Sequence, residues 1–95
     1  METRVAIIGI IVEDSASVEK LNTILHSYGK YIIGRMGLPY REKNISIISI
    51  AIDAPPDIIS ALSGKLGKLP GVSTKAVYSK ITGKVDSEVP NETID

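Results

Sequence analysis

The 95-residue chain contains no cysteine, no tryptophan and no phenylalanine, and its only histidine is His26. Disulfides are therefore excluded, and one histidine without a thiol argues against a transition-metal site made of nitrogen and sulfur ligands. A chain of this length buries only about 60 to 65% of the surface that its unfolded form exposes, so its stability is marginal without reinforcement. Oligomerisation is the favoured reinforcement.

An excess of charge is also missing, because 11 basic residues balance 11 acidic ones. Residues 1–80 hold ten basic and seven acidic residues, a net charge of +3, which is too small for nucleic-acid binding through phosphate contacts. Residues 81–95 hold one lysine and four acidic residues with little apolar content. We therefore expect one domain over residues 1–80, a flexible acidic tail over 81–95, and no direct nucleic-acid binding.

Long apolar runs are absent from the start of the chain. The segment Val5–Val12 is far shorter than the roughly 20 residues that span a bilayer. It follows an acidic residue, Glu2, and lacks the small-residue cleavage site of a secretory signal. The expected location is cytoplasmic, with no membrane contact.

Six segments have the apolar spacing of regular structure. Alternating or continuous apolar residues predict strands, and apolar residues three and four apart predict amphipathic helices. The strands are expected over 3–12, 30–40, 45–54 and 72–78, and the helices over 15–28 and 57–69. The order βαββαβ predicts an α+β ferredoxin-like sandwich, with an antiparallel sheet of order 4-1-3-2 and two helices on one face.

Two of these strands, over 5–12 and 45–52, are apolar on both faces. The helices cover one face of such a sheet, and apolar surface left in water costs about 25 cal/mol for each Å². We therefore expect a second subunit to cover the other face, giving a homo-oligomer (dimer or tetramer) through the sheet face.

Three stretches together resemble the family of iron-only hydrogenase system regulators: RVAIIGIIV (4–12), YGKYIIGRMGLPY (28–40) and DAPPDIISALSGKLGKLPGVSTKAVYSK (53–80). The resemblance implies an ACT-like fold, similar to the C-terminal sensor domain of nickel-responsive ribbon-helix-helix repressors, with an oligomeric state and a regulatory role. Those repressors bind nickel through several histidines and a cysteine, whereas this chain has only His26. We expect no nickel site of that kind and no other metal.

The segment EDSAS (13–17) joins the first strand to the first helix and has two interpretations. Asp14, Ser15 and Ser17 can each cap the helix. In ACT-like domains the same place commonly holds an amino-acid effector at a subunit interface, because N–H groups at a helix start can hold a carboxylate. Glu13 or Asp14 would then hold the amine. Glu13, Asp14, Ser15 and Ser17 are candidate ligand-binding residues.

Arg35 is the fifth candidate. It lies between Gly34 and Gly37, two glycines within a strand pattern, which indicate a bulge or the close approach of a ligand or another backbone. Arg35 can pair with an anionic ligand or with an acidic residue of a neighbouring subunit.

The sequence contains no recognisable arrangement of catalytic residues. The segment SGKLGKLPG (63–71) lacks the order of a phosphate-binding loop, and no serine lies in a nucleophile elbow. His26 lies off the apolar stripe and is expected at the surface or an interface. We predict a non-catalytic regulatory domain without a cofactor. The alternatives are a structural or protein-interaction oligomer without a small ligand, and an enzyme using Glu13 or Asp14 in a cleft.

Overall fold

The structure, a computed structural model, describes residues 2–80. Its strands are β1 (Arg4–Val12), β2 (Ile32–Tyr40), β3 (Ile45–Ala54) and β4 (Val72–Tyr78), and its helices are α1 (Val18–Ser27) and α2 (Pro56–Gly67). Two short 3₁₀ turns, Ser15–Ser17 and Gly29–Tyr31, flank α1. The tail expected over 81–95 lies outside the described residues, so that expectation stays a prediction.

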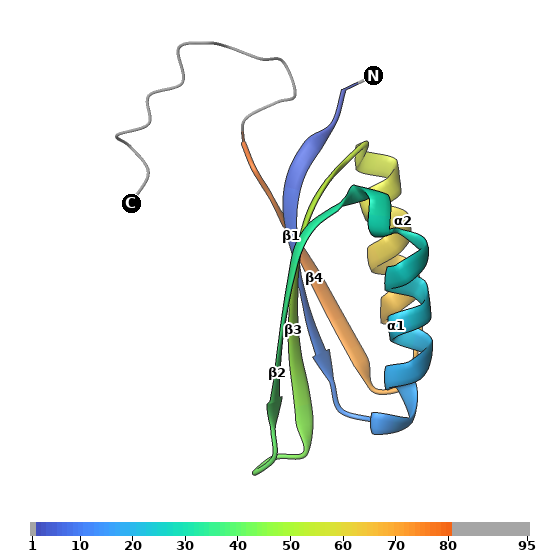
Figure 1. Cartoon of the computed structure of the whole chain (residues 1–95), viewed down its shortest axis with the longest axis vertical. Coiled ribbons are helices and arrows are strands. Elements are labelled where there is room, and N and C mark those ends of the chain that lie inside the picture. Colours follow the sequence, from blue (N-terminus) through green and yellow to red (C-terminus); the bar gives the residue numbers. More distant parts are fainter. Residues whose placement is uncertain (1, 81–95) are drawn as a thin grey trace, which may run out of the picture.

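The four strands form one antiparallel sheet with the order β2-β3-β1-β4. This is the predicted order read from the opposite edge. Both helices lie on the same side of the sheet (Figure 1). The ferredoxin-like, ACT-like sandwich expected from the sequence is therefore confirmed.

Several element boundaries differ from the prediction by one to three residues. The first helix begins at Val18 rather than Ser15, because residues 15–17 form a 3₁₀ turn. The second strand begins at Ile32 rather than Lys30, because the amide of Tyr31 donates to the carbonyl of Tyr28, 3.0 Å away, in a second 3₁₀ turn. Tight turns of this kind are common at helix ends and shift boundaries by one turn or less.

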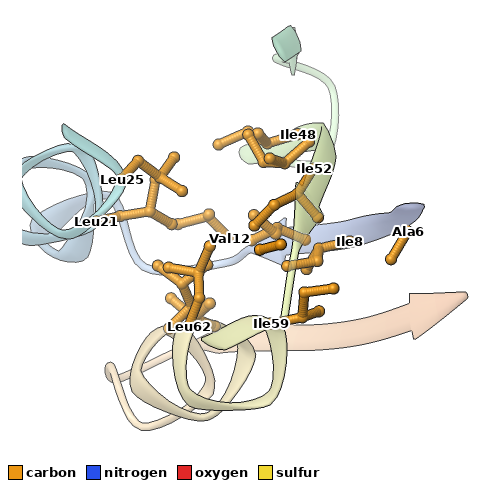
Figure 2. Close-up of a cluster of buried hydrophobic side chains, with 14 residues drawn as sticks. Ala6, Ile8, Val12, Leu21, Leu25, Ile48, Ile52, Ile59 and Leu62 are labelled. Carbon is orange, nitrogen blue, oxygen red and sulfur yellow. The ribbon is translucent and has the colours of Figure 1, made fainter. Parts of the chain in front are cut away.

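The core lies between the sheet and the two helices. Alternate residues of β1 are buried, as expected for a strand with one face on a core. Figure 2 shows Leu21 and Leu25 of α1 and Leu62 of α2 directed toward side chains of the central strands. The buried apolar residues are Ala6, Ile8, Ile10, Val12, Leu21, Leu25, Ile48, Ile50, Ile52, Ala54, Ile59, Leu62, Leu66 and Val72.

The opposite side of the sheet, called the open face from here on, is covered by no element within residues 2–80 (Figure 1). Strand register and alternation assign its residues. They are Val5, Ile7, Gly9, Ile11, Gly34, Met36, Leu38, Tyr40, Ile45, Ile47, Ser49, Ala51, Asp53, Ser73, Lys75 and Val77. Ile7 is 50% exposed and Val77 66%, so this face carries apolar surface in water. What covers it stays a prediction.

Candidate functional site

A groove lies beside β2 on the helix side of the sheet. β2 is an edge strand, and all its residues after Ile32 are exposed. One hollow of about 230 Å³ lies between α1 and β2, and a second of about 220 Å³ lies at the end of the sheet. Both are lined by Pro39 and Ser46, so they are neighbours, and the two hollows together are called the β2 groove. Its other lining residues are Val12, Ser15, Val18, Asn22, Arg35, Gly37, Leu38, Tyr40, Arg41, Asn44, Ile45 and Ile48.

The groove has room because Gly37 and Pro39 of β2 have small side chains. Opposite the buried strand β3, the helix side of β2 presents Arg35, Gly37 and Pro39. A Cβ atom added at Gly37 would meet no atom within 4 Å, so the space above this position is open. The groove is thus a direct consequence of the sequence GRMGLP in an edge strand.

Arg35 spans the groove from β2 to α1. Its guanidinium donates a hydrogen bond of 2.6 Å to the side-chain oxygen of Asn22. A guanidinium carries five N–H donors, so this one bond leaves donors that can face a ligand. Asn22 therefore orients Arg35 without using up its capacity to bind an anion.

The β2–β3 turn supplies the other polar end of the groove. Asn44 has a φ of 59°, a left-handed conformation that asparagine tolerates better than most residues, and its amide donates to the carbonyl of Arg41 at 3.1 Å. This closes a tight turn and places Arg41 and Asn44 in the lining beside Ser15. The turn lies there because Val12 at the end of β1 pairs with Ser46 at the start of β3.

The lining of the β2 groove contains two arginines and no aspartate or glutamate. The nearby carboxylate of Glu42 accepts a 2.8 Å hydrogen bond from the hydroxyl of Tyr40. This hydrogen bond raises the pKa of Tyr40 above its ordinary value of 10.0. The groove therefore has the charge of a site for a small anion, since arginine matches carboxylates and phosphates in geometry.

Of the five candidate ligand-binding residues, Ser15 and Arg35 line the groove. The amide of Glu13 donates to the carbonyl of Gly71 at 2.7 Å, and the side chain of Asp14 accepts from the amide of Ala16 at 3.0 Å. Both acidic side chains are exposed. The ligand role of these four residues stays a prediction.

Ser17, the remaining candidate, is buried with 3% of its surface exposed. Its hydroxyl donates a 2.6 Å hydrogen bond to the carbonyl of Pro70. The structure thus joins the segment 13–17 to the turn between α2 and β4 through Ser17 and Glu13. Ser17 has a structural contact here, and its predicted role in binding a ligand is not tested.

Sequence reasoning did not identify Arg41 or Asn44 as site residues. Residues 41–44 lie between the predicted strands over 30–40 and 45–54, so the sequence alone predicts only a connection there. The signal that points to them is topological: in a βαββαβ sheet the β2–β3 turn lies at the same end as the segment after β1 (Figure 1). Once the strand order is accepted, polar residues of that turn become neighbours of Ser15.

Other kinds of site find little support within residues 2–80. No group of three or more His, Cys, Asp or Glu side chains in this part of the chain could hold a metal ion. His26 is exposed in the last turn of α1. Neither described helix is long and apolar enough to cross a membrane.

Comparison with known proteins gives one family. The model of the TM1266-like family, described as "Iron-only hydrogenase system regulator, putative", matches residues 4–76. The solved structure of the uncharacterized protein TM1266 from Thermotoga maritima is 38% identical in sequence, with a TM-score of 0.79. The match covers 82% of this chain and 99% of that one.

A more distant structure shares only the fold. A formyltetrahydrofolate deformylase from Pseudomonas putida KT2440 matches with a TM-score of 0.56 at 11% identity, over 77% of this chain and 28% of that chain. No curated protein gives a significant match. The ACT-like architecture is therefore shared with an enzyme, but nothing of that enzyme's chemistry follows from the likeness.

Proposed function

Since the chain belongs to the TM1266-like family of iron-only hydrogenase system regulators, we propose that it is a non-catalytic regulatory domain that senses a small anionic ligand in the β2 groove. The family description supports a regulatory role. The observation that carries the ligand proposal is the pair of arginines, Arg35 and Arg41, in a groove whose lining has no carboxylate. A regulator that catalyses no reaction needs only to bind its ligand, and the two arginines of this groove can supply the binding energy.

The size and chemistry of the groove favour a ligand such as an amino acid. Small-molecule sites begin at about 300 Å³, which is more than either hollow alone, so such a ligand would have to extend over both. Arg41 and the side-chain amide group of Asn44 can bind a carboxylate at one end. The exposed acids Glu13 and Asp14 directly precede Ser15 in the lining and can hold an ammonium group.

The groove also borders the open face. Tyr40 and Ile45 belong both to its lining and to the open face. A subunit seated on that face would reach this end of the groove. Ligand binding at the junction of two subunits is therefore part of the proposal.

The test is thermal unfolding of the full chain with the twenty amino acids, small dicarboxylates and inorganic phosphate as separate probes. A probe present at 100 times its Kd adds about 2.7 kcal/mol to the stability. For a domain of this size that raises Tm by roughly 10 to 20 °C. We expect at least one carboxylate probe to raise Tm and Arg41→Gln to abolish the rise.

Lys43→Gln is the matched control, because Lys43 lies in the same exposed turn but outside the lining of the groove. It removes the same unit of charge and is expected to keep the rise in Tm. The proposal fails if no probe raises Tm, or if Arg41→Gln and Lys43→Gln respond alike.

The second candidate is a structural or protein-interaction oligomer with no small ligand. The exposed apolar residues of the open face favour it, since they call for a protein partner and not for a metabolite. It predicts an unchanged Tm with every probe and a stable assembly without additives. The thermal scan therefore separates the two candidates.

A further inference from the structure

Gly9 lies at the centre of the open face, where neither the backbone conformation nor a contact within residues 2–80 requires a glycine. It lies in the middle of β1, opposite Ser49 of β3 and Lys75 of β4. A Cβ atom added at Gly9 would meet nothing closer than the carbonyl oxygen of Lys75 at 3.9 Å, which is an ordinary contact. Gly71 is the glycine with a positive φ among residues 2–80, so the backbone at Gly9 suits any residue.

A glycine in a strand interior costs about 0.5 to 1 kcal/mol relative to alanine. When nothing in the same chain requires it, a strand glycine indicates the close approach of another backbone or side chain. Close packing of another chain on this face would give the glycine at position 9 such a role.

The missing side chain leaves a shallow hollow of about 500 Å³ over Gly9, with Ile11, Ile47 and Lys75 in its lining. The strand register places an apolar row on each side of it. One row runs through Leu38, Ile47 and Ile11, and the other through Ala51, Ile7 and Val77. The open face is thus a depression between two apolar ridges.

The size of the open face suits a dimer. Four strands of 7 to 10 residues, spaced by about 4.8 Å with a rise of about 3.3 Å per residue, span a projected area on the order of 500 Å². Side-chain relief makes the accessible area larger than the projection, and a stable interface buries about 800 Å² per partner. A second sheet of the same dimensions covers the whole face.

The charge of the open face suits a copy of itself. Its charged residues are Asp53 on β3 and Lys75 on β4, one of each sign. In a two-fold interface residue i meets residue j and residue j meets residue i, so each copy can match the charges of the other. The face has no cluster of one sign that would select a strongly charged protein or an anionic membrane.

We infer that the open face binds a second copy of this chain, sheet against sheet, in a two-fold dimer in which a large apolar side chain of each copy fills the hollow over Gly9 of the other. Packed sheets lie about 10 Å apart, so a side chain at position 9 would compete with the partner for that space. The inference rests on the open face alone and does not depend on the ligand proposed for the β2 groove.

The experiment is sedimentation velocity of the full chain over a dilution series, with Gly9→Val as the test variant. Valine favours strands and has room at position 9 within its own chain, so the variant is expected to fold. We expect a dimer for the parent chain and a dimer Kd at least 100-fold weaker for Gly9→Val. Circular dichroism confirms that the variant is folded.

Gly37→Val is the matched control. It makes the same change in a strand, with no atom within 4 Å of the added Cβ, but on the helix side of the sheet. It is expected to dimerise like the parent chain. If Gly9→Val does not fold, Val77→Glu takes its place, because Val77 is 66% exposed on the open face and has no packing to lose.

Three results would overturn the inference. The first is a parent chain that stays monomeric at every concentration. The second is a dimer that Gly9→Val or its replacement leaves unchanged. The third is a dimer weakened equally by Gly37→Val. Loss of the ligand-induced rise in Tm would leave all three measurements unaffected, so failure here is distinguishable from failure of the proposed function.

Discussion

Gly71→Ala is expected to destabilise the fold strongly, and the turn between α2 and β4 explains why. Gly71 has a φ of 69°, in the left-handed region. An added Cβ would lie 2.7 Å from the Cβ of Asp14 and 2.9 Å from its amide nitrogen. The carbonyl of Gly71 also accepts from the amide of Glu13 at 2.7 Å. The turn and the segment after β1 therefore cannot separate without losing this bond.

Two contributions set the size of the effect. The left-handed conformation costs about 1 to 2 kcal/mol for a residue with a Cβ. Overpacking against Asp14 adds roughly 1 to 3 kcal/mol, because the contact is with backbone and Cβ and not with the end of a flexible side chain. We expect the free energy of unfolding to fall by about 2 to 5 kcal/mol in total.

The measurement is urea unfolding followed by circular dichroism at one fixed protein concentration, because self-association also stabilises the fold. With a slope of about 1 to 3 kcal/mol per M, the midpoint should fall by on the order of 1 M or more. Gly64→Ala is the control, since Gly64 is exposed in α2 with nothing within 4 Å of an added Cβ. It should raise stability by about 1 kcal/mol. An unchanged or higher midpoint for Gly71→Ala would refute the reasoning.

Two further predictions concern single hydrogen bonds. Ser17→Ala removes the buried donor to the carbonyl of Pro70 and should lower the free energy of unfolding by about 1 to 2 kcal/mol, whereas Ser27→Ala, at an exposed position, should change it by less than about 0.5 kcal/mol. Equal effects of the two variants in urea unfolding would contradict this. Glu42→Gln replaces a charged acceptor by a neutral one, so the pKa of Tyr40 should fall toward 10.0 in an NMR titration of its ring. A pKa that stays the same or rises would show that the hydrogen bond is not the cause.

The fold could be predicted because its elements differ in periodicity. The even-numbered residues of β1 from Ala6 to Val12 are buried, and the apolar residues of α1 and α2 that face them recur at three and four positions. The start of α1 could not be predicted, since Asp14, Ser15 and Ser17 are all competent caps. Asp14 caps the 3₁₀ turn, while the hydroxyl of Ser17 bonds to Pro70, 53 residues away. The hydrogen bond from Ser17 to Pro70, which is a tertiary contact, thus leaves Asp14 as the residue whose side chain caps the turn.

The candidate site was harder to predict than the fold. Ser15 and Arg35 could be singled out from local composition, because a capping segment and a strand arginine between glycines are visible in the sequence. Arg41 and Asn44 join them only through the pairing of Val12 with Ser46. Such proximity is a property of strand register and has no local signature.

The position of β1 in the sheet has a consequence for how the chain folds. Of the four strands of this sheet, β1 is synthesised first and lies in the centre, and its partners β3 and β4 begin only at Ile45 and Val72. Its isoleucine-rich segment therefore emerges from the ribosome long before either partner exists. Chains dominated by such long-range pairings fold slowly, over about milliseconds to seconds for the most non-local topologies, and expose apolar strands to aggregation while they wait. A destabilised β4 should thus reduce the yield of folded protein in cells as well as its stability in solution.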